Sequence, residues 1–380
     1  MGHILQCHKI MKTDFVRGQG CYLYDAQGKR YIDFESGIWS TALGHCHPRI
    51  NQAMEAQLKR VVHLGTYYPS PLAESAALDV LDIVGIDDGK CVFLSSGSEA
   101  VEFGVQAARR VTGKKLLLTF TSSYLAAYGS AGRKSADEWY LLDLKTYAND
   151  CLKEIPFEHI GGFVFEPGGS GIGFVRFPPK DIVREIAQRV KQANGLLIAN
   201  EITTGMGRTS KWFGFQHYDF QPDIVSIGKG LGNGYPVSAV AMKRDVAEKL
   251  ENSGLYYAQS HQNDPLGCVV AKEVIATFRE ENWVERSDAT GSYFLEELKK
   301  LERKYDIVKE ARGRGMLLAL EFHPHEKFSA ETAYHALLER GFLVGYSPVG
   351  NILRFDPALI ISKDDILLLL KNLDHILKEV

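Results

Sequence analysis

Cysteine is scarce in this chain of 380 residues, which contains only six. The cysteines are widely spread and include no Cys-x-x-Cys pair, so the sequence indicates neither a disulfide framework nor a cysteine-based zinc centre. The simplest interpretation is that the thiols stay reduced, as in a cytoplasm. These cysteines are Cys7, Cys21, Cys46, Cys91, Cys151 and Cys268.

A surplus of charge of either sign is also missing. Lys and Arg number 44 and Asp and Glu number 47, which leaves a formal net charge of −3 at pH 7. Proteins that bind nucleic acids or acidic membranes carry a basic excess or stripe, so neither partner is expected here.

Long hydrophobic runs are absent as well. No apolar stretch reaches the roughly 18 residues needed to cross a bilayer. The opening segment, MGHILQCHKIMKTDF, lacks the basic and apolar regions of a signal peptide, so we expect a cytoplasmic protein. Hydrophobic residues make up 45% of the chain and charged residues 24%, which is typical of a folded globular protein. At this length, about two lobes are expected.

Short apolar runs recur through the middle of the chain, separated by amphipathic stretches such as 180–193. Each run is too short for a helix and predicts a strand buried on both faces of a parallel sheet, with helices as the crossovers. The runs are 92–94, 116–118, 163–165, 196–199 and 224–227. We therefore expect an α/β fold.

The pattern changes after about residue 270. Long amphipathic helices are predicted over 283–304, 330–340 and 363–378, with short strands at 315–322 and 352–355 between them. This part of the chain predicts a smaller α+β lobe.

Polar residues follow the apolar runs on their C-terminal side, where ligands collect in open α/β sheets. The loop Ser96–Ser98 joins a strand to a helix. Either its backbone N–H groups bind a phosphate, or its serine is an ordinary N-cap. Lys229, in a glycine-rich segment, is either a Schiff-base nucleophile with a lowered pKa or a solvated lysine in a turn.

Two other strand ends carry candidates. Asn200 closes the run 196–199 and either faces a ligand or caps the next turn, while strand alternation places Glu201 on the opposite face. Arg354 is a lone arginine in an apolar strand and suits either a bound carboxylate or an internal ion pair. His45 and His47 are discounted as metal ligands, because no matching Cys/His cluster follows them.

In combination, these segments resemble the class III aminotransferases, which are pyridoxal-phosphate (PLP) enzymes of fold type I. The resemblance spans nearly the whole chain and rests on 20–33 (GCYLYDAQGKRYID), 43–48 (LGHCHP), 96–100 (SGSEA), 200–208 (NEITTGMGR) and 226–240 (SIGKGLGNGYPVSAV). It implies a large domain with a mostly parallel sheet flanked by helices, and a smaller α+β domain. The implied division is 49–268 for the large PLP-binding domain, 269–380 for the small domain, and 1–48 as an N-terminal segment that joins the small one.

The resemblance also implies roles for individual residues. Lys229 would form the Schiff base with PLP and then move a proton during catalysis, and Arg354 would bind the substrate carboxylate. Ser260 would reach the phosphate of the neighbouring subunit, so a homodimer with shared active sites is implied. Tyr124 and Ile202 would pack on the two faces of the cofactor ring. The full cofactor-binding set is Gly97, Ser98, Tyr124, Glu166, Asn200, Ile202, Thr203, Lys229 and Ser260.

Some positions depart from the family pattern. Asn200 stands where the family has an aspartate that keeps the pyridine nitrogen protonated, and an amide cannot supply that negative charge. Glu201 is not expected to replace it, because it points to the other face. Thr203 replaces a usual glutamine, Leu125-Ala126 replaces a common His-Gly pair, and Gly171 stands where ornithine-type members carry a glutamate.

The leading hypothesis is therefore a PLP-dependent aminotransferase that moves an amino group from an amino acid or amine to a 2-oxo acid through the Lys229 Schiff base. The weaker stabilisation of negative charge that follows from Asn200 leaves an amino-acid racemase or epimerase as an alternative. A PLP-binding protein with vestigial activity is a third hypothesis.

Overall fold

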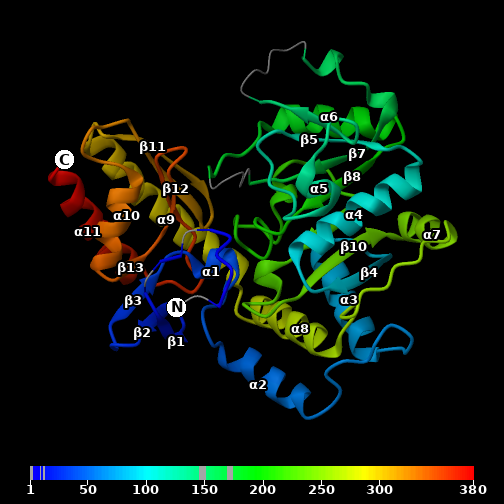
Figure 1. Cartoon of the computed structure of the whole chain (residues 1–380), viewed down its shortest axis with the longest axis horizontal. Helices are drawn as coiled ribbons and strands as arrows, with labels where there is room; N and C mark the ends of the chain where they lie inside the picture. The colour runs from blue at the N-terminus through cyan, green and yellow to red at the C-terminus, as the bar shows by residue number, and fades with distance from the viewer. Residues whose placement is uncertain (1–2, 9, 12, 145–150, 169–173) are drawn as a thin grey trace.

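The computed structural model describes residues 3–8, 10–11, 13–144, 151–168 and 174–380. Figure 1 shows a larger lobe around a central sheet and, beside it, a smaller lobe that contains both the N-terminal strands and the C-terminal helices. The predicted α/β class, with a large sheet lobe and a smaller α+β lobe, is confirmed. Position 171, one of the departures from the family pattern, lies outside the described residues.

The larger lobe is built on a seven-stranded sheet of order β4-β10-β9-β8-β7-β5-β6. Neighbouring strands from β9 to β6 are parallel, and β10 is antiparallel to both of its neighbours. Each predicted apolar run lies in one of these strands. The strands are β4 (Gly89–Leu94), β5 (Leu116–Phe120), β6 (Trp139–Leu142), β7 (Ile160–Phe165), β8 (Leu196–Asn200), β9 (Ile224–Ile227) and β10 (Ser238–Lys243).

Helices cover both faces of this sheet, which explains why its strands are apolar on both sides. Val164 and Ile198 pack with α4 and α7 on one face, and Phe163 and Leu197 pack with α6 on the other. The helices of this lobe are α2 (Pro48–Leu58), α3 (Pro71–Val84), α4 (Gly97–Thr112), α5 (Gly129–Arg133), α6 (Lys180–Gln192), α7 (Arg244–Asn252) and α8 (Pro265–Glu280).

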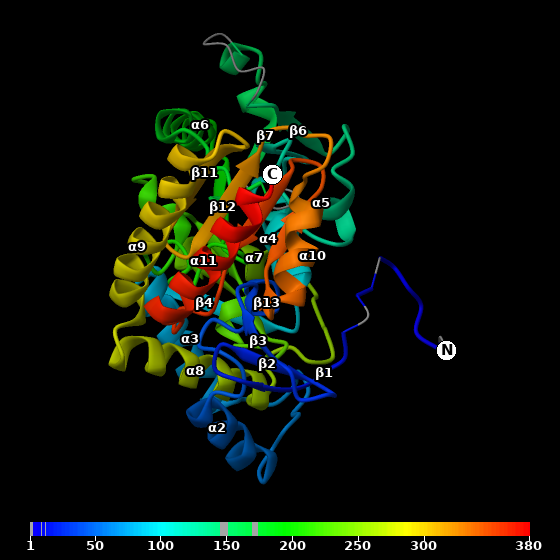
Figure 2. The ribbon, with the colours of Figure 1, turned by 90° about the vertical axis from the view of Figure 1, so that its left-hand side faces the viewer.

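The smaller lobe contains two four-stranded sheets, β11-β12-β15-β14 and β1-β2-β3-β13. Strand β13 is parallel to β3, so the N-terminal strands lie against the C-terminal part of the chain (Figure 2). The predicted helices appear as α9, α10 and α11. The elements are β1 (Phe15–Gln19), β2 (Tyr22–Asp25), β3 (Arg30–Asp33), α1 (Ser36–Trp39), α9 (Trp283–Lys304), β11 (Val308–Arg314), β12 (Leu317–Phe322), α10 (Ala330–Glu339), β13 (Phe342–Leu343), β14 (Gly345–Ser347), β15 (Ile352–Phe355) and α11 (Lys363–Lys378).

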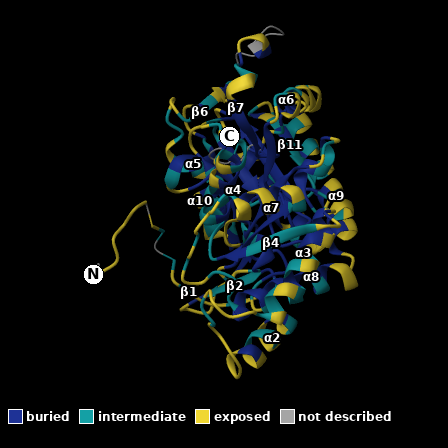
Figure 3. Ribbon diagram, turned by 90° about the vertical axis from the view of Figure 1, so that its right-hand side faces the viewer, coloured by how far each residue is buried: buried dark blue, intermediate teal, exposed yellow. Residues whose placement is uncertain are grey.

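Buried residues fill the middle of both lobes, and the exposed ones lie on the outer helix faces and loops (Figure 3). A domain boundary is predicted at position 268, and helix α8 continues without a break across that position. The predicted division of the chain into domains therefore stays a prediction. Within the described ranges, no helix is both long and apolar enough to span a bilayer.

Candidate active site

A cavity of about 570 Å³ lies at the C-terminal ends of the large-sheet strands, where the smaller lobe meets them. Both lobes contribute, and most of the predicted site residues line it. The lining residues are Ile38, Trp39, Ser96, Gly97, Ser98, Tyr124, Leu125, Asn200, Ile202, Thr203, Lys229, Tyr346, Ser347, Pro348 and Arg354.

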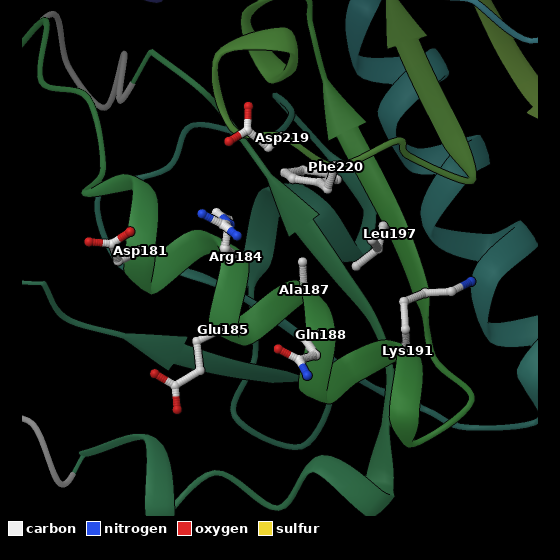
Figure 4. A pocket seen from close by; sticks show the side chains of 9 residues that line it. All are labelled: Asp181, Arg184, Glu185, Ala187, Gln188, Lys191, Leu197, Asp219 and Phe220. Carbon is white, nitrogen blue, oxygen red and sulfur yellow. The ribbon is translucent and has the colours of Figure 1, made fainter.

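Another depression, of about 530 Å³, lies beside α6 and is shown in Figure 4. Charged side chains of that helix, including Asp181, Arg184 and Glu185, border it. It contains no residue of the predicted site, so the cavity between the lobes is the candidate active site.

Lys229 follows β9 and projects into the cavity from a backbone of φ 45°, a left-handed conformation that is uncommon for a lysine. Its Nζ donates a hydrogen bond to Thr203 Oγ1 at 3.2 Å and lies 4.1 Å from the centre of the Trp39 ring. Burial lowers the pKa of Lys229 to about 8, with Glu166 opposing the shift. Lys229 is therefore a largely enclosed amine of lowered pKa and not a solvated turn residue.

The N-terminus of α4 opens into the same cavity. Ser96 is indeed the N-cap, since its Oγ accepts from Glu99 N at 3.3 Å while Glu99 Oε2 accepts from Ser96 N at 2.8 Å. The next two backbone N–H groups, of Gly97 and Ser98, belong to the first turn of the helix, where intrahelical acceptors are lacking. The capping and anion-binding interpretations of this loop are thus compatible, because they use different atoms.

Gly97 allows a close approach at this point. A Cβ atom at position 97 would lie 2.7 Å from Ile202 Cγ2, so only glycine lets Ile202 pack against the helix terminus. Ser98 Oγ accepts a hydrogen bond from Ala127 N at 2.9 Å, which fixes the hydroxyl at the rim of the cavity.

Asn200 and Glu166 hold the backbone of Tyr124 from two sides. Asn200 Nδ2 donates to Tyr124 O at 3.2 Å, and Glu166 Oε2 accepts from Tyr124 N at 3.0 Å. Asn200 Oδ1 also accepts from Ile202 N at 3.3 Å, so the predicted turn-capping role is present as well. The Tyr124 residue is 53% exposed and borders the cavity, which leaves its ring available to a ligand.

Glu201 points away from the cavity, as strand alternation predicts. Its carboxylate accepts hydrogen bonds from Gly214 N at 2.8 Å, Phe215 N at 2.7 Å and Thr204 Oγ1 at 2.7 Å. Burial raises the pKa of Glu201 to about 7. Its oxygens already accept from these partners outside the cavity, so Glu201 does not replace the carboxylate that the family has at position 200.

Arg354 lines the cavity and is ion-paired at the same time, so the internal ion pair is confirmed and the binding of a substrate carboxylate stays a prediction. Its Nε donates to Asp356 Oδ1 at 2.9 Å, and its Nη2 donates to Glu35 Oε1 at 3.2 Å. The guanidinium carbon also lies 4.3 Å from the centre of the Trp39 ring.

Trp39 and Glu35 are the residues that sequence reasoning missed. The turn Ser36–Trp39 has positive φ at every residue, between 46° and 68°, and this left-handed path places Trp39 between Lys229 and Arg354. The signal in the sequence was a large aromatic residue between two motifs that match the family.

Some candidates lie outside the cavity. Ser260 is exposed and does not line it in a single chain. His45 pairs with Asp33 at 2.8 Å. Among the residues that the structure describes, His63, His261 and Asp264 are the group with metal-ligand geometry, and they too lie apart from the cavity.

The residues present fit PLP. The helix terminus at Gly97 and Ser98 presents N–H groups to the cavity that suit a phosphate, and Asn200 presents an amide whose second N–H can serve a pyridine nitrogen. A buried lysine of lowered pKa lies in the same cavity. Fold and site together define a PLP-dependent enzyme of fold type I.

The comparisons with known proteins identify the family. The model of the class III aminotransferases matches residues 6–129 and 135–377, and the chain belongs to this family. The acetylornithine aminotransferase of Methanopyrus kandleri is 31% identical over 92% of this chain and 90% of that protein. That of Aquifex aeolicus is 30% identical over 96% and 97%. The crystal structure of the acetylornithine aminotransferase from Elizabethkingia anophelis has 26% identity and a TM-score of 0.88, covering 100% of this chain and 97% of that one.

Membership of this family carries the reaction with it. The chain is a PLP-dependent aminotransferase that moves an amino group from an amino acid or amine to a 2-oxo acid. Nothing in the comparisons favours the racemase alternative.

Proposed function

We propose that this aminotransferase uses Lys229 as its catalytic amine and Arg354 to bind the carboxylate of its substrates. The observation that carries the proposal is that Lys229 and Arg354 line one cavity and that each contacts the ring of Trp39. When bound, PLP supplies an aldehyde that takes up amino groups and a ring that withdraws electrons from the neighbouring carbon.

The residues around the cavity divide the work of holding the cofactor. The N–H groups of Gly97 and Ser98 would bind its phosphate at the positive end of α4. Tyr124 and Ile202 would pack on the ring faces, with Glu166 fixing the backbone of Tyr124. Asn200 would donate an N–H to the pyridine nitrogen and Thr203 would bind near the ring hydroxyl.

Lys229 would move the proton that transamination requires. As a neutral amine, its Nζ would accept the proton that leaves the amino-bearing carbon of the substrate. As an ammonium, it would return that proton to the cofactor carbon that takes up the amino group. A pKa of about 8 makes both forms accessible near neutral pH. The hydrogen bond to Thr203 Oγ1 keeps Nζ inside the cavity.

We also propose that the enzyme is a homodimer in which Ser260 completes the phosphate site of the neighbouring subunit. Apolar side chains are exposed on 58–68 and 255–256, and these segments touch through Tyr67 and Tyr256. His63 of the first segment also contacts His261, just beyond the second. An exposed apolar surface of this kind is typical of a subunit interface.

The free cysteines among the described residues fit a reducing compartment, so a cytoplasmic location stays part of the proposal.

The relatives that are 29–31% identical to this chain are named acetylornithine aminotransferases, which suggests a donor whose amino group is distant from a carboxylate. The test is to mix the purified holoenzyme with a panel of amino acids and amines in the absence of any oxo acid. Conversion of the cofactor absorbance to that of pyridoxamine phosphate identifies the donor. If no donor converts it, the proposed function is wrong.

A further inference from the structure

Arg354 is shared by two carboxylates that differ in their surroundings. Asp356 is fully buried and takes the Nε side of the guanidinium, whereas the Glu35 side chain is 23% exposed and takes Nη2. Burial raises the pKa of Asp356 to about 6, and two cations, Arg354 and the buried Arg208, oppose this rise. Asp356 is thus a fixed partner, and Glu35 is the partner that solvent can reach.

The guanidinium cannot easily turn away from this position. One contact is the Trp39 ring, 4.3 Å from the guanidinium carbon. Another is the backbone at Gly345, where an added Cβ would lie 2.7 Å from Arg354 Nη2. A ligand carboxylate must therefore meet the arginine where it stands, at its nitrogens toward the cavity.

We propose that Glu35 controls the binding of substrate carboxylates by competing with them for Nη2 of Arg354, and that a carboxylate binds together with the uptake of one proton by Glu35. This inference rests on the proposed role of Arg354 and names its positioning residue. The proton comes from solvent and goes to Glu35, so that the charge of the incoming carboxylate replaces the charge of the glutamate.

The groups around Glu35 make this exchange favourable. Burial and the neighbouring Asp356 raise the pKa of Glu35 to about 7, Arg354 opposes this, and Asp33 adds to it. From α10, Tyr334 faces the same carboxylate, and burial together with Glu35 raises the pKa of Tyr334 to about 12, so the phenol stays neutral. A further negative charge at Arg354 therefore drives protonation of Glu35.

The sign of the pH dependence follows. Below a pH of about 7, Glu35 is already protonated and carboxylate binding does not depend on it. Above that pH, each unit costs a carboxylate ligand about tenfold in affinity, because the proton must first be acquired. An amine without a carboxylate does not use Arg354, so its binding escapes this dependence.

The experiment uses the PLP holoenzyme and glutarate, a dicarboxylate that carries no amino group to transfer. Isothermal titration calorimetry at a pH of about 8.5, in buffers of different ionisation enthalpy, reports the protons taken up on binding. We expect about one proton for the wild type at this pH and close to none at a pH of about 5.5. This measurement needs no variant and no turnover.

Glu35→Gln keeps the size and the polar contact of the side chain but removes its charge. It should abolish the proton uptake and tighten glutarate binding by about tenfold or more at a pH of about 8.5. Glu310→Gln is the matched control, because Glu310 is an ion-paired glutamate on β11 that lies outside the cavity lining. It should leave both values unchanged.

The outcomes separate the two proposals. Glutarate binding with no proton uptake, and unchanged by Glu35→Gln, overturns the role of Glu35 and leaves Arg354 as the carboxylate site. No glutarate binding at either pH overturns the role of Arg354 and this inference with it. Half-reaction rates add an independent check: Glu35→Gln should alter KM for 4-aminobutyrate at high pH and leave butylamine unaffected.

Discussion

At the scale of single residues, Lys229 is the first test. Lys229→Ala removes the only amine that the described cavity lining contains, so we expect the visible absorbance of the lysine-bound cofactor to disappear. Transamination should fall by at least about 100-fold, since a positioned acid–base group is worth that much. Lys191→Ala, which removes an exposed lysine that pairs with the buried Asp223, serves as the control, since Asp223 keeps its second partner Lys243. Retention of the absorbance band in Lys229→Ala would show that another amine binds the cofactor.

Asn200 gives the second prediction at this scale. Asn200→Asp removes the N–H that donates to Tyr124 O. It would place a carboxylate toward the pyridine nitrogen of bound PLP, where a charge-assisted bond of about 1.5–3 kcal/mol would replace a neutral one of about 0.5–1.5 kcal/mol. We expect the half-reaction to speed up by about tenfold, measured by stopped-flow absorbance. An equal or slower rate would mean that the rest of the site is adapted to the amide. Asn252→Asp, at the exposed end of α7, controls for the added charge.

Polar residues at the end of a buried strand, such as Asn200 and Lys229, could be found from the sequence because an abrupt change of polarity after a short apolar run marks them. Trp39 and Glu35 carry no such mark, and only the position of a large aromatic residue between two family motifs pointed to Trp39. Trp39 reaches the cavity through a left-handed turn, and Glu35, just before that turn, reaches Arg354. No local sequence pattern predicts four consecutive positive φ angles. Their partner, Arg354, is more than 300 residues away along the chain.

At the scale of elements, two variants at the N-terminus of α4 should distinguish its contribution to protein stability from its contribution to PLP binding. Ser96→Ala removes the side-chain cap and should lower the free energy of unfolding by about 1 kcal/mol while leaving the N–H groups of Gly97 and Ser98 in place. Gly97→Ala inserts a methyl group 2.7 Å from Ile202 Cγ2, and overpacking of this kind costs about 1–3 kcal/mol.

We therefore expect Gly97→Ala to weaken PLP binding by about tenfold or more, and Ser96→Ala to lower the Tm with little change in PLP affinity. Fluorescence titration of the apoenzymes and thermal unfolding measure the two effects. If both variants lose affinity equally, the whole first turn and not the glycine cradle holds the phosphate.

Several strands of the large sheet and the three long C-terminal helices were predictable, because short continuous apolar runs and amphipathic helices have distinct patterns. The antiparallel direction of β10 was not. Its residues, Ser238–Lys243, are as apolar as those of the parallel strands beside it, and a strand covered on both faces carries no mark of its direction.

At the scale of the whole molecule, the single chain leaves Ser260 exposed and outside the cavity. If the active sites are shared, Ser260 acts in the neighbouring subunit, and two defective chains can repair each other. Lys229→Ala inactivates the site of its own chain, while Ser260→Asp inactivates the site of its neighbour by repelling the phosphate.

In a mixed dimer of these two variants, one site contains both the intact lysine and the intact serine. We therefore expect refolding or co-expression of the two inactive variants to restore transaminase activity, approaching about half of the wild-type value per mixed dimer, since one of its two sites is complete. Mixing Lys229→Ala with Asn200→Ala is the informative control. Both of these residues line the cavity of one chain, so each mixed dimer then has one site without its lysine and one without its asparagine, and activity should stay low. No recovery in the first mixture would mean that Ser260 acts in its own chain. Equal recovery in both mixtures would mean that Lys229 and Asn200 do not act in the same site.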